Sequence, residues 1–258
     1  MNTDLKGKNA LVCGSTQGIG LAAAKELALL GANVTLLARN EEKLNEAVSL
    51  LDTNNKQLHS CLVADFSDNK QIKDIISKNN QFHILVNNTG GPPGGKAIEA
   101  DIEEFTTAFS NHLINNQLLA QAITPFMVSE GYGRIINIIS TSVKMPLNGL
   151  GVSNTIRGAV ASWSKTLANE LGGFGITVNN VLPGATNTVR LQSIIETKAK
   201  KLQKTMEEVE AAMKAEIPAG RFADASEVAS AIAFLASPAA GYINGINVPV
   251  DGGRTGCL

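Results

Sequence analysis

Short runs of apolar residues alternate along the chain with longer segments in which apolar residues recur at helical spacing. The runs are rich in Val, Ile and Leu and are followed by Gly, Asn or Pro, a pattern typical of buried strands that end in turns. It predicts strands over residues 8–13, 33–38, 57–63, 83–87, 134–139, 177–182 and 245–250. The intervening segments predict helices over residues 19–30, 41–51, 68–78, 101–127 and 153–171.

This alternation predicts an α/β fold. Runs that are apolar throughout, such as RIINII at 134–139, are typical of strands buried on both faces of a parallel sheet. We therefore expect a single Rossmann-type, doubly wound parallel sheet of about seven strands, with helices on both faces. Because no linker or repeat divides the chain, residues 1–258 are expected to form one domain. The Lys- and Glu-rich residues 190–216 would form a helical lid outside the core.

Composition narrows the classes of function. Of the 258 residues, 44% are hydrophobic and 17% are charged, and the net charge is -1, which is ordinary for a globular protein. Without clustered Lys and Arg, neither a nucleic acid nor an anionic membrane is an expected partner. The sequence contains no long apolar span and no signal-peptide pattern. Cys13, Cys61 and Cys257 lack the spacing of a metal site or disulfide framework, so we expect no metal and a cytoplasmic location.

A glycine-rich loop separates the first predicted strand from the first predicted helix. Glycines permit a tight turn and close approach of the backbone to a phosphate, and the helix start adds free N–H groups and a positive dipole end. The segment therefore predicts a dinucleotide site. Its residues are Gly14, Ser15, Thr16, Gln17, Gly18, Ile19 and Gly20.

The spacing of this loop, GxxxGxG, resembles that of the short-chain dehydrogenase/reductase family. Other segments resemble motifs of that family in the same order, and together they cover roughly residues 6–253. They include NNTG at 87–90, PGATNT at 183–188 and a C-terminal run over 220–253. The resemblance implies that Asp65 contacts adenine and that the later loops border the nicotinamide. The cofactor residues it adds are Asp65, Asn88, Gly90, Pro183, Gly184 and Thr188.

The end of the second predicted strand bears on the choice of cofactor. Enzymes of this fold that use NAD place an acid there for the ribose 2′-OH, whereas this sequence has Ala38 followed by Arg39. Arg39 is able to pair with a 2′-phosphate, so NADP(H) is favoured over NAD(H). The alternative is that Arg39 is a surface residue paired with Glu41 or Glu42.

The resemblance also implies a catalytic set of Asn, Ser, Tyr and Lys, from which this sequence departs. Ser140 matches the serine, but Ser153 and Arg157 stand where the family has the Tyr and Lys of YxxxK. His112 occupies the Asn position, unless a one-residue slip of the helix places Asn111 there. These departures, with the GGPP segment at 90–93, resemble a divergent subgroup of β-ketoacyl-acyl-carrier-protein reductases.

Two functions follow from this resemblance. The first is an NADP(H)-dependent oxidoreductase similar to 3-oxoacyl-acyl-carrier-protein reductase, acting on a small-molecule or acyl-thioester carbonyl. Ser140 and Arg157 would polarise the carbonyl, and Ser153 or a water would bridge to it. His112 would be the alternative acid, since the ordinary imidazole pKa is about 6.5. The second is a non-catalytic NADP(H)-binding sensor or partner subunit. The helices over 101–127 and 153–171 resemble those of the family's interfaces, so a homotetramer or dimer is expected.

Overall fold

The computed structural model describes residues 1–257 and contains a seven-stranded sheet in the order β3-β2-β1-β4-β5-β6-β7. Every neighbouring pair of strands is parallel, which confirms the predicted doubly wound α/β fold. The strands are β1 (Asn9–Cys13), β2 (Asn33–Ala38), β3 (Ser60–Val63), β4 (Ile84–Asn87), β5 (Gly133–Ile138), β6 (Ile176–Pro183) and β7 (Asn247–Val250).

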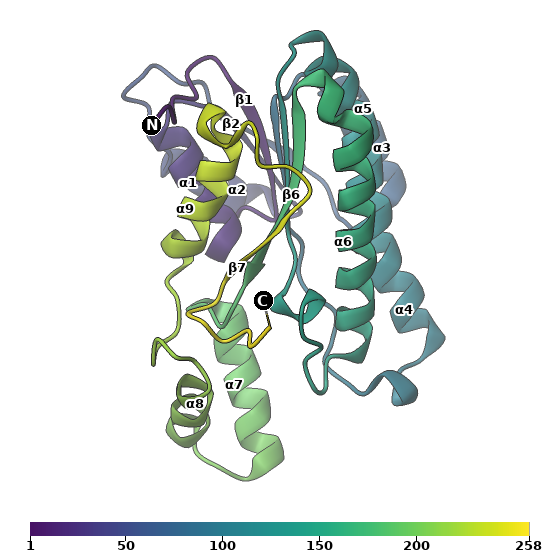
Figure 1. The fold of residues 1–258 in the computed structure, drawn as a ribbon, viewed down its shortest axis with the longest axis vertical. Helices are drawn as coiled ribbons and strands as arrows, with labels where there is room; N and C mark the ends of the chain where they lie inside the picture. The colour runs from purple at the N-terminus through teal and green to yellow at the C-terminus, as the bar shows by residue number, and fades with distance from the viewer. Residues whose placement is uncertain (258) are drawn as a thin grey trace.

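Helices cover both faces of the sheet (Figure 1). On one face lie α1 (Gly18–Leu29), α2 (Glu41–Ser49) and α9 (Ala225–Ala236), which share a hydrophobic core with the sheet. On the other lie α3 (Asn69–Lys78), α5 (Asn115–Ser129) and α6 (Gly151–Leu171), around a second core. Among residues 1–257 no helix has the length and apolar character that crossing a membrane requires.

Some predicted boundaries shift for local reasons. Asn40 and Asp68 cap α2 and α3 by accepting hydrogen bonds from backbone N–H groups in the first turn, so these helices begin where expected. The third strand begins at Ser60 instead of residue 57. The buried side chain of Gln57 donates to the carbonyl of Ala28 at 2.7 Å, which turns this residue inward before the strand starts.

Residues 102–129 are helical throughout, as predicted, but the helix is not α-helical over its whole length. The chain forms α4 (Ile102–Phe109), a π-helical turn (Ser110–Ile114) and then α5. Tertiary bonds anchor both ends of the turn: Ser110 Oγ donates to Asn69 Oδ1 at 2.5 Å, and Asn69 Nδ2 donates to Asn115 Oδ1 at 2.6 Å. Such turns accommodate an extra residue in a helix and are frequent at functional sites.

Residues 189–215 form two helices at one end of the molecule, below the sheet in Figure 1. They are α7 (Val189–Leu202) and α8 (Met206–Ala215), which we call the α7–α8 unit. The unit has its own small core, separate from the two cores against the sheet. Its buried members are Leu191, Ile195, Ala199, Val209, Ile217 and Phe222.

A row of asparagine side chains crosses four strands beneath α6. Asn87, Asn137, Asn180 and Asn247 are partners in register on β4, β5, β6 and β7. Each amide donates to the next, from Asn87 to Asn137 at 2.8 Å, from Asn137 to Asn180 at 3.0 Å and from Asn180 to Asn247 at 2.8 Å. Asn137 also donates to Ser164 of α6 at 3.3 Å. This asparagine ladder ties the strands to one another inside an otherwise apolar layer.

Candidate functional site

A cleft of about 700 Å³ opens at the carboxyl ends of the parallel strands, where open α/β sheets bind ligands. It is lined by residues of the loop after β1, the ends of β2, β4, β5 and β6, the start of α6 and the start of α7. The cleft therefore gathers segments that lie far apart in the sequence, including most of those singled out above.

The glycine-rich loop is closely packed against the end of β4. A Cβ atom on Gly14 would lie 2.5 Å from the backbone oxygen of Asn88, and one on Gly20 would overlap the carbonyl of Gly14. Asn88 Nδ2 donates to the carbonyls of Cys13 and Gly14, at 3.3 and 3.1 Å. Side chains larger than hydrogen at either glycine would push the loop out of this position.

The loop residues divide into two groups. Gly14, Thr16, Gln17, Gly18 and Ile19 line the cleft. Ser15 and Gly20 do not line the cleft and are buried within the fold.

The Oγ atom of buried Ser15 accepts from the backbone N–H of Leu37 at 3.1 Å, which ties the loop to β2. The first turn of α1, from Gly18 to Leu21, is uncharged, so its free N–H groups and dipole present positive potential to the cleft.

At the end of β2 and β3, Arg39 and Asp65 both line the cleft. Hydrogen bonds from Ser67, and to a smaller extent the charge of Arg39, hold the pKa of Asp65 below its ordinary value. Within residues 1–257, the ion pairs do not include Arg39, so the alternative pairing with Glu41 or Glu42 is not formed. The exposed guanidinium of Arg39 is therefore available to a ligand.

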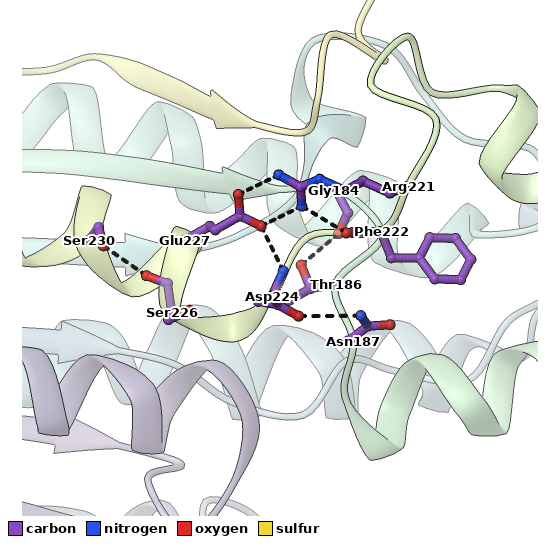
Figure 2. Close-up of polar contacts among 9 residues, drawn as sticks. All are labelled: Gly184, Thr186, Asn187, Arg221, Phe222, Asp224, Ser226, Glu227 and Ser230. Carbon is purple, nitrogen blue, oxygen red and sulfur yellow. Dashed lines mark hydrogen bonds and ion pairs between the residues drawn. The ribbon is translucent and has the colours of Figure 1, made fainter.

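The cleft is also lined by the other residues suggested by resemblance: Asn88, Gly90, Pro183, Gly184 and Thr188. Figure 2 shows how the loop after β6 is anchored to the start of α9. Arg221 and Glu227 form two hydrogen bonds of 2.7 Å, and Glu227 accepts a third from the backbone of Asp224 at 2.9 Å. Asp224 in turn accepts from Asn187 at 3.4 Å, so this ion pair buttresses the loop that borders the cleft.

Ser140, Ser153 and Arg157 line the same cleft. Ser140 follows β5, and its Oγ accepts from the N–H of Ser142 at 3.1 Å, which leaves its hydroxyl proton free to donate. Ser153 lies in the first turn of α6, one turn before Arg157. Within the described chain no tyrosine lines the cleft: Tyr132 donates to the carbonyl of Ala236, and Tyr242 is fully exposed.

Arg157 is 8% exposed and donates to the backbone oxygen of Ile138 at 3.2 Å. Burial lowers its pKa from the ordinary value to about 10, so the side chain remains charged near neutral pH. None of the ion pairs in the described part of the chain involves it. The cleft thus contains a buried positive charge that has no counter-ion among residues 1–257.

His112 and Asn111 lie on the π-helical turn and point to different surroundings. Asn111 lines the cleft, whereas His112 is 2% exposed and its Nδ1 forms a 2.5 Å hydrogen bond with Thr89 Oγ1. Burial, together with the charge of Arg157, lowers the pKa of His112 to about 3. The imidazole is therefore neutral near pH 7, which counts against its use as a general acid.

Arg190 at the start of α7 also lines the cleft and was missed in the sequence. Its Nη2 donates to the carbonyl of Pro92 at 3.2 Å, joining α7 to the loop at 90–95. The polar, charged composition of residues 190–216 gave no signal that separated this arginine from its neighbours.

Comparisons with known proteins agree with this geometry. A family model described as enoyl-(acyl carrier protein) reductase matches residues 14–255. The chain is 34% identical to 3-oxoacyl-[acyl-carrier-protein] reductase FabG of Vibrio cholerae, over 97% of this chain and 98% of the relative.

Two solved structures are also similar. L-sorbose reductase from Gluconobacter frateurii, complexed with NADPH and L-sorbose, has a TM-score of 0.93 and 29% identity, with 100% of both chains covered. A short chain dehydrogenase/reductase family protein has a TM-score of 0.84 and 30% identity, with 97% of this chain and 99% of the other covered. The chain is therefore a member of the short-chain dehydrogenase/reductase family of oxidoreductases.

Proposed function

We propose that the protein is an NADP(H)-dependent reductase of carbonyl compounds with an atypical catalytic set. One observation carries the proposal: a single cleft contains the glycine-rich loop, two serine hydroxyls and a buried arginine. The loop, the uncharged first turn of α1 and the exposed Arg39 fit a dinucleotide with a 2′-phosphate. The L-sorbose reductase with which the chain shares its fold was solved with NADPH, which supports this cofactor.

When bound, a nicotinamide cofactor supplies the hydride. The residues assigned to holding it are the loop residues that line the cleft, with Arg39 and Asp65 at one end and Asn88, Gly90, Pro183, Gly184 and Thr188 at the other. Ser140 and Ser153 would donate hydrogen bonds to the carbonyl oxygen of the substrate. The fixed charge of Arg157 would stabilise the negative charge that develops on that oxygen.

The source of the proton differs from that in relatives with a tyrosine. Ser153 is a weak acid, and Arg157 keeps its proton near neutral pH. The lowered pKa of His112 leaves its imidazole neutral near pH 7, so this side chain is not the proton donor either. We therefore assign proton delivery to water in the cleft, passed through the hydroxyl of Ser153, with Asn111 as an additional hydrogen-bonding group.

Calorimetry with NADPH and NADH tests the proposed cofactor. We expect Arg39→Gln to weaken NADPH binding about tenfold to a hundredfold, since hydrogen bonds to a charged group contribute about 1.5–3 kcal/mol, and to leave NADH binding nearly unchanged. Lys43→Gln, an exposed cation on α2 outside the cleft, is the matched control. Equal loss for both nucleotides would refute the role of Arg39, and no binding of either would refute the whole proposal.

Consumption of NADPH in the presence of small ketones, oxo acids and ketoacyl thioesters tests the reaction. Turnover of any of these compounds supports the reductase. The absence of the family's Tyr and Lys favours a second candidate, a non-catalytic NADP(H)-binding sensor or partner subunit. Tight NADPH binding without turnover across the panel would establish this second function instead.

A further inference from the structure

Arg157 carries a buried positive charge for which residues 1–257 provide no acidic partner. Its guanidinium adjoins the cleft. A buried charge without a counter-ion is costly unless a ligand compensates it. A neutral ribose or ketone oxygen accepts a hydrogen bond from it but does not cancel its charge.

The surroundings of Arg157 favour an anion. The part of the cleft formed by the loop at 90–92, α6 and α7 contains a second cation, Arg190, and among the described residues it contains no carboxylate. Among residues 1–257, the one acid that lines the cleft is Asp65, at the ends of β2 and β3 beside Arg39. Leu150, Val189 and Ile194 supply apolar wall near the two arginines.

We propose that the substrate is a short oxo acid, whose carboxylate Arg157 binds close to the reacting carbonyl, with Arg190 as a second cation in the same part of the cleft. This inference rests on the proposed function, since it assigns the substrate of the same cleft. A planar guanidinium binds a carboxylate through two parallel hydrogen bonds, and the single charges match. A ketoacyl thioester has no charge next to its ketone and would leave Arg157 uncompensated. The apolar wall suits a short aliphatic tail.

The reaction then balances with the cofactor already proposed. The carbonyl carbon gains a hydride and its oxygen gains a proton from water, so that the oxo acid becomes a hydroxy acid while NADPH is oxidised to NADP⁺. The carboxylate is unchanged and remains paired with Arg157 throughout.

The test compares acids with neutral analogues of the same shape. Calorimetry on the protein–NADPH complex measures binding of oxamate, which is not reduced, against that of neutral oxamide. Turnover is measured with pyruvate and 4-methyl-2-oxopentanoate against their methyl esters. We expect the wild-type protein to prefer the acids by about a hundredfold in kcat/KM and in binding. In Arg157→Gln the preference should fall to about threefold or less, and Arg157→Lys should restore part of it.

Arg190→Gln should reduce the preference by about threefold to tenfold, since this side chain is exposed. Lys198→Gln, which removes an exposed cation of α7 outside the cleft, should leave the preference unchanged. The inference would be overturned if the acids and their neutral analogues were bound and reduced equally well, or if none of the acids bound. In either case, binding of NADPH would still support the proposed function. If NADPH itself does not bind, the proposed function fails. If Arg157→Gln does not fold, the wild-type comparison decides.

Discussion

At the scale of single residues, the pKa of His112 links proton chemistry to stability. Because burial lowers it to about 3, the unfolded chain takes up a proton between about pH 6.5 and 3 that the folded chain does not. The stabilisation is fully present above about pH 6.5 and is lost as the pH falls, by about 1.4 kcal/mol per unit at most. We expect urea unfolding at pH 7, 6 and 5 to show this loss in the wild type and a weaker dependence in His112→Asn.

Parallel pH dependences of the two proteins would show that His112 titrates alike in the folded and unfolded chains. The same variant measures any catalytic role. A proton donor contributes about a hundredfold or more to the rate, so a small change in turnover at pH 7 would confine His112 to positioning Thr89.

At the scale of elements, the α7–α8 unit should open independently of the sheet, because its core is its own. Ile195 is 4% exposed within that core, and its replacement by alanine should destabilise the unit by about 2–4 kcal/mol. We expect Ile195→Ala to speed hydrogen exchange over residues 189–222, measured by mass spectrometry, while β1, β4 and β5 exchange as in the wild type.

Leu202→Ala is the matched control, since this leucine lies on the same helix and is 57% exposed. It should leave exchange of the unit unchanged. Faster exchange throughout the sheet in Ile195→Ala would show instead that the unit and the sheet open together. Binding of an oxo acid beside Arg190 should slow exchange at the start of α7, where the unit meets the cleft.

At the scale of the whole molecule, the asparagine ladder connects four of the seven strands of the sheet. Asn137→Ala would leave the Nδ2 group of Asn87 and the Oδ1 group of Asn180 without their partners in a buried layer. We expect a loss of about 2–4 kcal/mol in the free energy of unfolding, measured by urea denaturation. Asn247→Ala, at the less buried end, should cost about 1 kcal/mol. Equal costs at both positions would contradict this expectation, since Asn137 makes two bonds of the ladder and Asn247 makes one.

The fold was largely predictable because a parallel sheet needs apolar strands, and apolar strands followed by turn residues are visible in the sequence. The loop at 14–20 was predictable for a related reason, since close packing leaves no alternative to glycine. The asparagine ladder was not predictable, because Asn137 and Asn180 are only polar residues within apolar strands until the register of the strands is known. Arg190 gave no signal either, because its contact with Pro92 joins positions remote in sequence.

The extra residue in the π-helical turn also has an evolutionary consequence. Because the turn already absorbs one residue more than a regular helix, deleting one residue from it would leave α4 and α5 in place and rotate the side chains between them by about 100°. The identity of the side chain offered to the cleft is thus set by backbone winding as well as by mutation. A lineage with this chain could exchange the amide of Asn111 for the imidazole of His112 without replacing either amino acid.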